Sequence, residues 1–519
     1  MRSFGLPLPT NLVAADVRRL TLFHTKVRAS SRRLLRGSSS RCGFEESRRH
    51  PTLPRRSQAL LACSVALLLV VSAASAETGP VTGSKVYHQL KKDVDQIRLI
   101  DTHEHLSNED AYLKRPADFL ARMLHYVESD LISAGMPRAS GGKPLRVQDL
   151  DVPLPERWEL FQTYWREMRF TGYGRALGRV VKDLYGLDLD STTPAMASQL
   201  NERIAAANKP GLYRRVLKEK ARIDLSIVDV GGKPDPEFFV AVRRFDNFIN
   251  VHSQKELENL GTQNGVSVSS LEDLVRALEA AFTNAVQDGI VGVKSGLAYS
   301  RRIYYPRPSD GEARAAFDKL KSGGPVSGED ILPLQNYLMH QVCRLAGQHR
   351  LPFQIHTGLQ TGSGNTITNS KPTDLINLIM AYPDVKFVIF HGSYPYGPEL
   401  STMAKNFPNV FIDLCWLHII SPKVARESLS EWIETVPANK ITGFGGDYLY
   451  VEGAYAHAEM AREVVTATLA EKVLSGYLTP ADARELAVKF LRNNAIDLYR
   501  LKVPKASAPG KLSQPAGQR

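Results

Sequence analysis

The chain has 519 residues and a formal charge of +12, and 43% of its residues are hydrophobic and 23% charged. Such a composition is typical of a folded globular protein. It excludes a disordered chain, a collagen-like chain and a membrane protein with several spans. The basic excess could indicate nucleic-acid binding, but residues 1–76 hold 13 Lys/Arg against three Asp/Glu, about ten of the twelve charges. The remainder is close to neutral, so no nucleic-acid partner is expected.

Residues 1–76 predict a targeting leader. Arg55 and Arg56 precede the apolar run Ala59–Val71, and Ala-Ser-Ala ends at Ala76. This order is typical of a secretory signal peptide, and the run is shorter than the ~20 residues that span a bilayer. We therefore expect a periplasmic or secreted protein with no stable membrane span in the mature chain. An uncleaved membrane anchor, an organelle transit peptide and a mis-assigned start are the alternatives.

Short apolar segments alternate with helical patterns over most of the remaining chain. This alternation indicates parallel βαβ units. Eight strands are predicted, at Ile97–Ile100, Arg222–Val230, Arg244–Val251, Ile290–Lys294, Phe353–Ile355, Phe387–Phe390, Val410–Leu414 and Ile441–Phe444. Helices are predicted at Leu271–Gln287, Asp330–Gln348, Thr373–Ala381, Pro422–Thr435 and Ala454–Leu474. Eight such units favour an α/β fold of the (β/α)₈ TIM-barrel class; an open doubly wound sheet is the alternative, but no glycine-rich loop follows the first strand.

Two insertions are predicted in a barrel domain of residues 77–501. Residues 106–220, with helices at Glu156–Arg169 and Thr192–Ala207, follow the first strand. They would lie over the mouth where barrel active sites are found. Aromatic side chains there could cap a pocket or form the insertion's own core: Trp158, Phe161, Tyr164, Trp165, Phe170 and Tyr173. A smaller insertion, Ser295–Gly328, follows the fourth strand, and residues 502–519 are predicted to be a disordered tail.

Polar residues stand at the ends of the predicted strands. The first strand runs into His103-Glu104-His105, and residues two apart on a strand share a face, so both imidazoles should point into one site. Two such imidazoles suit a Zn²⁺-type cation, although an HxH sequence alone is weak. Four more residues stand at later strand ends: Lys294, His356, His391 and Asp447. In a barrel these ends meet at one mouth, which makes the set a stronger signal than any member.

Cysteine contributes little to this site. Cys343 and Cys415 are the two cysteines after the leader, no CxxC occurs, and a disulfide between them is less expected than two buried free thiols.

The sequence resembles the amidohydrolase superfamily, in its amidohydrolase-related branch of metal-dependent barrel hydrolases. The resemblance extends from Ile100–Leu106 (IDTHEHL) to the final helix with Asn494 and Tyr499. It includes QIHTG at Gln354–Gly358, FHGSYPY at Phe390–Tyr396 and GGDYLY at Gly445–Tyr450. GVKSGLAYS, at Gly292–Ser300, is similar to a sub-branch fused in some organisms to glutamine-synthetase-like domains. The long insertion after the first strand also resembles uronate isomerases.

This resemblance implies roles for individual residues. His103, His105, His356 and Asp447 would hold a divalent metal, expected to be Zn²⁺, and His391 would bind a second metal or position a substrate oxygen. Lys294 would bridge two ions if carbamylated; otherwise it would pair with a substrate carboxylate or with another side chain. One ion is therefore expected, or two with a carbamylated lysine.

The chemistry of such a site suggests hydrolysis. A bound metal lowers the pKa of water toward ~7, Asp447 would move the proton to the leaving group, and His391 would stabilise the oxyanion. Arg301 and Arg302 could bind a substrate carboxylate or form surface pairs, and Trp416 could line the mouth. Asp101 could orient a ligand histidine, while Asp229 and His418 were ambiguous. His125, His252, His340, His349 and His457 lack strand-end positions and are expected to be structural or surface residues.

The expected function is metal-dependent hydrolysis of a C–N or C–O bond in a small, anionic substrate. A decarboxylase, a hydratase or a uronate-type isomerase on the same barrel is the first alternative, because fold and metal site do not decide among them. A non-catalytic metal-binding barrel is the second. A homo-oligomer is compatible with the sequence.

Overall fold

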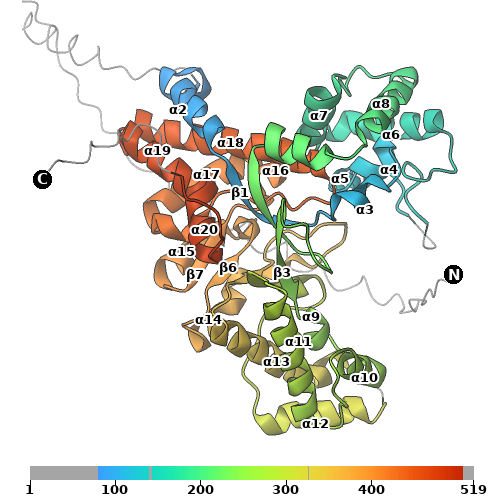
Figure 1. The fold of residues 1–519 in the computed structure, drawn as a ribbon, viewed down its shortest axis with the longest axis vertical. Helices are drawn as coiled ribbons and strands as arrows, with labels where there is room; N and C mark the ends of the chain where they lie inside the picture. The colour runs from blue at the N-terminus through green and yellow to red at the C-terminus, as the bar shows by residue number, and fades with distance from the viewer. Residues whose placement is uncertain (1–79, 140–142, 325, 507–519) are drawn as a thin grey trace, which may run out of the picture. The chain divides into compact units, whose positions relative to one another are not determined.

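The computed structural model describes residues 80–139, 143–324 and 326–506. The predicted leader with its signal peptide, and the predicted tail beyond residue 506, lie outside this range. Eight parallel strands pair in chain order (Figure 1). They are β1 (Leu99–Glu104), β2 (Ile223–Val228), β3 (Phe239–Arg244), β4 (Gly292–Ser295), β5 (Phe353–Ile355), β6 (Phe387–Ile389), β7 (Val410–Asp413) and β8 (Ile441–Thr442).

Contacts between β1 and the chain after β8 bring the two edges of the sheet together. The amide of Thr102 donates to the Phe444 carbonyl (3.1 Å), and the amide of Asp447 donates to the His103 carbonyl (2.8 Å). The barrel fold is thereby confirmed, with the residues that follow β8 held directly against the end of β1. This closure brings residues more than 340 positions apart into one site.

Helices connect the strands and begin where the sequence supplies caps. The helices after the first insertion are α9 (Asp246–Ile249), α10 (Gln254–Gln263), α11 (Leu271–Gln287), α12 (Asp310–Lys321), α13 (Gly328–Gln348), α14 (Ile376–Ala381), α15 (Gly397–Asn406), α16 (Leu417–Ile420), α17 (Pro422–Thr435), α18 (Val451–Leu474), α19 (Pro480–Val488) and α20 (Asn494–Tyr499). Ser270 and Asp273 form a reciprocal capping box on α11, which fixes its start. The predicted bounds of α11 and α17 are confirmed.

The third strand was predicted at the wrong place. The prediction, Arg244–Val251, took Phe248, Ile249 and Val251 as the apolar run of a strand. These residues are buried, but they belong to α9 and its surroundings, while the strand is the preceding run Phe239–Arg244. Arg244 therefore ends β3 instead of beginning it. The first strand also starts later than predicted and continues through His103.

The insertion after β1 is helical, as predicted. It contains α3 (Glu109–Leu113), α4 (Phe119–Met123), α5 (Val127–Ser133), α6 (Leu154–Met168), α7 (Gly172–Tyr185) and α8 (Pro194–Ala207), which gather beside the strands in Figure 1. Trp158, Phe161 and Trp165 are buried in its core, whereas Phe170 is 71% exposed. Tyr173 alone among the predicted aromatics reaches the barrel mouth, where its ring stacks on Trp416.

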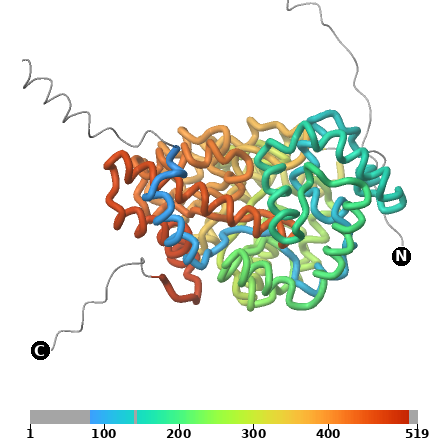
Figure 2. The backbone as a smooth tube through the Cα atoms, turned by 90° about the horizontal axis from the view of Figure 1, so that it is seen from above, coloured from blue at the N-terminus to red at the C-terminus, as the bar shows by residue number. Residues whose placement is uncertain are grey.

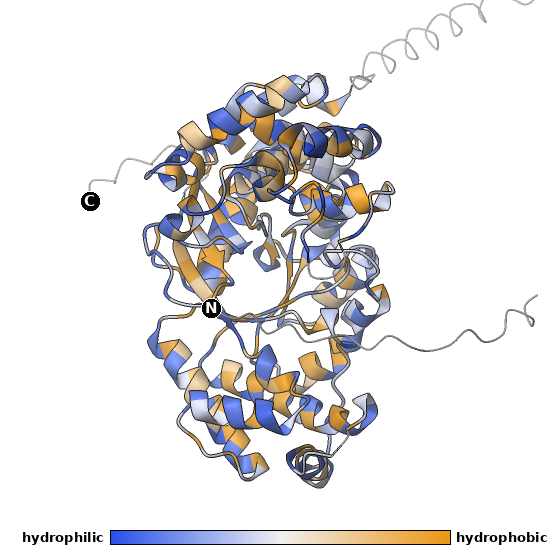
Figure 3. Ribbon diagram, turned by 90° about the vertical axis from the view of Figure 1, so that its right-hand side faces the viewer, coloured by the Kyte–Doolittle hydropathy of each residue, from blue (hydrophilic) through white to orange (hydrophobic). Residues whose placement is uncertain are grey.

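The smaller insertion after β4 consists of a short 3-10 helix, Leu297–Tyr299, followed by α12. Helix α2 (Lys85–Gln96) packs against α18 and α19, and Figure 2 shows this N-terminal helix beside the C-terminal ones. Hydrophobic residues concentrate on the strands and on helix faces, as Figure 3 shows. Within the described ranges, no helix combines the length and apolar character needed to cross a membrane.

Candidate metal centre at the barrel mouth

The end of strand β1 delivers two imidazoles whose Nε2 atoms face the cluster. The Nδ1 atom of His103 lies 3.1 Å from the amide oxygen of Gln354, and Nδ1 of His105 lies 3.2 Å from the carbonyl oxygen of Asp229. Both partners can only accept, so each Nδ1 carries a hydrogen and each Nε2 is directed into the cluster. The Gln354 amide is itself fixed, because its nitrogen donates to the Thr102 carbonyl and to the Tyr499 hydroxyl.

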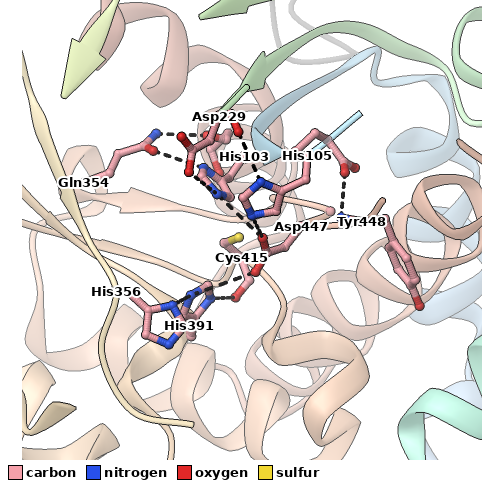
Figure 4. A network of polar contacts seen from close by, with 12 residues as sticks. His103, His105, Asp229, Gln354, His356, His391, Cys415, Asp447 and Tyr448 are labelled. Atoms are coloured by element: carbon pink, nitrogen blue, oxygen red, sulfur yellow. Dashed lines mark hydrogen bonds and ion pairs between the residues drawn. The ribbon is translucent and has the colours of Figure 1, made fainter. Parts of the chain in front are cut away.

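The carboxylate of Asp447 faces both Nε2 atoms (Figure 4). Its Oδ1 lies 3.1 Å from Nε2 of His105 and 3.6 Å from Nε2 of His103. Donors around a tetrahedral ion with bonds of ~2.0–2.1 Å lie about 3.3 Å apart, so the three atoms fit one divalent cation. The carboxylate of Asp229 is nearby, with Oδ2 3.9 Å from Nε2 of His103.

Burial and charge set the protonation of this cluster. Burial alone would raise the pKa of Asp447, but the His105 hydrogen bond and the neighbouring histidines hold that pKa well below its usual value. Burial, reinforced by Lys294, lowers the pKa of His103 well below its usual range. For His105, burial is outweighed by the hydrogen bond and charge of Asp447, and its pKa is raised. An ionised carboxylate therefore faces one neutral imidazole and one that retains a proton until a cation replaces it.

Three residues at the ends of consecutive strands adopt left-handed backbone conformations. They are His391 after β6 (φ 65°), Trp416 after β7 (φ 65°) and Asp447 after β8 (φ 60°). For residues other than glycine this conformation is uncommon and costs about 1–3 kcal/mol each. Such residues persist where the surrounding contacts fix them, and they cluster at functional sites.

Glycine immediately before Asp447 allows a close approach to Glu104. A Cβ atom on Gly446 would lie 1.8 Å from the Glu104 carboxylate, so a larger residue would displace that side chain. The amide of Gly446 donates to Asp101 (3.0 Å) and the amide of Tyr448 donates to Glu104 (2.7 Å). Asp101 was predicted to orient a ligand imidazole. Instead it accepts backbone hydrogen bonds from His103 and Gly446, and Gln354 orients the His103 ring.

His356 and His391 form a second, separate histidine pair. The Nδ1 atom of His391 lies 3.1 Å from the Cys415 carbonyl, and Nε2 of His356 lies 2.9 Å from the Leu359 carbonyl. The remaining nitrogens of the two rings face each other at 2.9 Å. Nε2 of His391 is 4.0 Å from Oδ2 of Asp447, and its pKa is lowered by burial to about 4. His356, predicted as a ligand, therefore stands behind His391 with both nitrogens engaged.

Lys294 is buried beside these groups without a hydrogen bond or ion pair to the described residues. Its Nζ atom lies 4.1 Å from the centre of the Phe390 ring, and only 2% of the residue is exposed. Burial, followed by the charge of Arg244, lowers its pKa. Arg244 binds Asp229 through its Nε atom (2.6 Å). Lys294 therefore lies near the cluster, but its amine is not hydrogen-bonded to any of the described metal-donor residues.

Aromatic side chains surround the cluster. Trp416 stacks on Tyr126 with ring centres 4.7 Å apart, and its ring lies edge-on to His391 at 5.2 Å. The Tyr126 hydroxyl donates to the Asp447 carbonyl, and the neighbouring His125 packs beside the Tyr448 ring at 5.7 Å. His125 and Tyr126 were missed as site residues because they lie inside the insertion, where no strand end indicates their direction.

Arg301 and Arg302, predicted to bind substrate, have other partners. Arg301 donates to the side chains of Gln335 (2.8 Å) and Asn336 (2.7 Å). Arg302 forms a bidentate pair with Asp374. None of these partners belongs to the cluster at the mouth. The two thiols are buried and free of disulfides, as predicted, and the Cys415 sulfur lies within 4.8 Å of donor atoms of His391 and Asp447.

The site and fold define a metal-dependent barrel enzyme, and comparisons with known proteins agree. Residues 265–501 match the family model described as Amidohydrolase. This part of the chain, somewhat less than half of it, is similar to the amidohydrolase-related branch of the amidohydrolase superfamily. The matched range includes Lys294, His356, His391 and Asp447, while His103 and His105 lie before it.

The individual relatives are of two kinds: one matches less than half of this chain, and the uronate isomerases match most of it. Protein fluG of Emericella nidulans is 29% identical over 249 residues, which are 46% of this chain but only 29% of that protein. A uronate isomerase of Rhizorhabdus wittichii is 21% identical over 458 residues, or 80% of this chain and 95% of that enzyme. The crystal structure of a glucuronate isomerase from Caulobacter crescentus superposes with a TM-score of 0.67 at 20% identity, covering 83% of this chain and 98% of that one.

Proposed function

We propose that this protein is a divalent-metal-dependent isomerase of a small sugar acid, converting an aldose of the uronate type into the corresponding ketose. The observation that carries the proposal is the extent of the similarity to uronate isomerases, which covers 80% of this chain and 95% of one such enzyme. The main expectation from the sequence was hydrolysis, with isomerisation as its alternative. The similarity supports the alternative better.

The proposed metal ligands are His103, His105 and Asp447, with Asp229 beside them. A divalent ion held there would supply Lewis-acid chemistry, drawing electrons from a carbonyl oxygen and favouring ionisation of the adjacent hydroxyl. The protein would hold this ion by two imidazoles whose direction Gln354 and the Asp229 carbonyl fix. Asp447 would contribute the negative charge.

His391 is the proposed proton carrier. Isomerisation removes the proton from the carbon that bears the hydroxyl, moves an electron pair to form an enediol, and returns a proton to the former carbonyl carbon. Nδ1 of His391 and Nε2 of His356 lie on backbone carbonyls, and the two nitrogens that face each other at 2.9 Å share one hydrogen bond. Burial lowers the pKa of both rings, so a proton that this pair takes up is readily given back.

The proposal is tested by incubating the full chain, supplied with Zn²⁺ or Mn²⁺, with D-glucuronate and D-galacturonate. We expect a ketose product and, in D₂O, deuterium at the carbon that was the original aldehyde. Absence of ketose from both sugar acids, with metal bound, would contradict the proposal.

Hydrolysis remains a second candidate because of Lys294. A buried amine with a lowered pKa and no hydrogen-bond partner is available to add CO₂, which forms an N–C bond, releases a proton and leaves a carbamate. Its oxygens could hold a second ion, and two ions suit cleavage of a C–N or C–O bond. Intact mass before and after addition of bicarbonate, with turnover of lactones and N-acyl amino acids, would separate the two functions. Hydrolysis that depends on bicarbonate would favour the second.

A further inference from the structure

The connection between β8 and α18, residues 443–450, carries Asp447 and is held from two sides. On the barrel side, the amide of Asp447 donates to the His103 carbonyl at the end of β1 (2.8 Å). On the other side, the hydroxyl of Tyr126, at the start of α5 in the insertion, donates to the Asp447 carbonyl. The barrel therefore fixes one peptide group of Asp447, and the insertion fixes the next.

The backbone of Asp447 depends on such contacts. Its φ of 60° lies in the left-handed region, which is unfavourable for residues other than glycine and persists only where the surroundings fix it. Rotation of either peptide group would move the carboxylate, whose Oδ1 lies 3.1 Å from Nε2 of His105 and 3.6 Å from Nε2 of His103. A binding site needs its groups held to within about 0.5 Å, so the Tyr126 hydroxyl affects the metal donors directly.

Three more contacts join the insertion to the chain that follows this metal donor. Arg115 donates to the Leu449 carbonyl (2.8 Å). The carboxylate of Glu452, in the first turn of α18, accepts from the hydroxyls of Tyr112 (2.7 Å) and Tyr185 (2.9 Å). Tyr112 belongs to α3 and Tyr185 to α7, so two separate helices of the insertion meet at one carboxylate.

The burial of Glu452 makes this meeting specific. The residue is only 1% exposed, and a buried carboxylate is unfavourable unless hydrogen bonds compensate for the lost water. Packings of α3 and α7 in which their hydroxyls do not reach Glu452 are therefore disfavoured. Glu452 thereby fixes how the insertion packs on α18, and this packing determines where Tyr126 meets the connection.

We propose that the insertion controls metal affinity through Tyr126, a positioning residue that orients Asp447, while Glu452 fixes the docked insertion. The inference rests on the metal ligands of the proposed function and adds the control of that site. Coupling between two sites is reciprocal. If the docked insertion strengthens metal binding, metal binding must strengthen the docking of the insertion to the same extent.

The first test measures Zn²⁺ affinity of the full chain by competition with a chromophoric chelator. Tyr126→Phe deletes the hydroxyl and leaves the ring that stacks on Trp416. We expect Zn²⁺ binding to weaken about tenfold or more, as is typical when a supporting contact of a metal ligand is lost. Tyr173→Phe is the matched control, because its ring stacks in the same aromatic layer but its hydroxyl is not the one that holds Asp447. This control should bind Zn²⁺ within about twofold of wild type.

Amide hydrogen exchange separates positioning from a purely structural role. Addition of Zn²⁺ to wild type should slow exchange in α5 (Val127–Ser133) by about tenfold or more, whereas in Tyr126→Phe the same addition should change it less than about twofold, since coupling is reciprocal. Tyr185→Phe removes one of the two donors to Glu452 and tests the docked insertion independently. It should weaken Zn²⁺ binding about threefold, because one hydrogen bond is lost at a distance from the donors.

The outcomes separate this inference from the proposed function. Unchanged Zn²⁺ affinity in Tyr126→Phe overturns the inference, even if the variant unfolds at a lower temperature. Equal Zn²⁺-dependent protection of α5 in wild type and Tyr126→Phe overturns it as well. Tyr126-dependent Zn²⁺ binding without ketose formation would support the inference and contradict the isomerase. Ketose formation with a metal affinity that Tyr126→Phe does not alter would do the reverse.

Discussion

Two pairs of histidines flank the β8–α18 connection, and they have opposite surroundings. On the mouth side, His103 and His105 direct their Nε2 atoms at an ionised carboxylate. On the other side, His418 donates toward the Gly443 carbonyl (2.9 Å) and His457 toward the Gly446 carbonyl (3.0 Å), and their second nitrogens have no partner among the described residues. His103, His418 and His457 are almost fully buried, and His105 is the exception.

The comparison teaches that burial of a histidine does not identify a site. Acceptors orient the rings of both pairs, so what separates the mouth pair is the converging carboxylate of Asp447. The rear pair holds the backbone on either side of Gly445 and thus supports the connection that carries Asp447. Four changes, in the side chains or in the pH, test this difference between the two pairs.

Asp447→Asn should abolish the function of the mouth pair. It removes the charge that faces both Nε2 atoms, so we expect turnover to fall by at least ~10³-fold, equivalent to about 4 kcal/mol in the activation free energy. Steady-state kinetics with equal metal loading measures this loss. Asp374→Asn, which affects only the pair with Arg302, is the control. Activity of Asp447→Asn within tenfold of wild type would remove Asp447 from the metal centre.

Gln354→Leu should weaken metal binding without deleting a ligand. It leaves Nδ1 of His103 without its acceptor, and loss of such a supporting hydrogen bond typically costs about 10–100-fold in metal affinity. Competition with a chromophoric chelator measures the affinity. Gln354→Glu keeps the acceptor and should retain more of the affinity than Gln354→Leu does. Equal affinity in Gln354→Leu and wild type would show that His103 needs no support.

The rear pair should make the protein less stable in acid. Burial lowers the pKa of His418 to about 4 and that of His457 to about 3. As the pH falls below 6.5, both rings therefore take up protons in the unfolded state before they do so in the folded state. Their contribution to the free energy of unfolding is complete above that pH. Between pH 6.5 and about 4, the free energy of unfolding should fall by up to ~1.4 kcal/mol per pH unit for each ring. Denaturant unfolding of His457→Phe should show a shallower slope than wild type; parallel slopes would refute the assignment.

His457→Phe should have the smallest effect on chemistry. It leaves the Gly446 carbonyl unpaired, which costs about 1–3 kcal/mol of unfolding free energy, but the metal donors remain. We expect an unchanged metal content and turnover within tenfold of wild type. The measurement is metal analysis together with kinetics at a temperature well below unfolding. Loss of metal from this variant would place the rear pair in the same functional unit as the mouth pair.

Much of this arrangement was predictable because barrel geometry converts sequence position into spatial position. Strand ends converge at one mouth, so His103, His105 and Asp447 could be grouped from a pattern alone. The prediction of His356 as an equal ligand depended on the same rule and stays a prediction; its ring contacts Leu359 and His391 here.

Other features depend on contacts that the sequence does not encode locally. Arg244 was hidden by the misplaced third strand, so its pairing with Asp229 could not be expected. Tyr126 and His125 come from the insertion, whose packing over the mouth is decided by tertiary contacts such as the Trp416–Tyr173 stack. Gly446 carried a readable signal, a double glycine before Asp447, but its cause, the Glu104 carboxylate, required the structure.

The metal site at the barrel mouth can be located by anomalous diffraction from crystals of the full chain grown with Zn²⁺. We expect an anomalous peak about 2.0–2.2 Å from Nε2 of His103, Nε2 of His105 and a carboxylate oxygen of Asp447. A fully loaded protein whose zinc lies elsewhere, with these three side chains hydrogen-bonded only to one another, would contradict it.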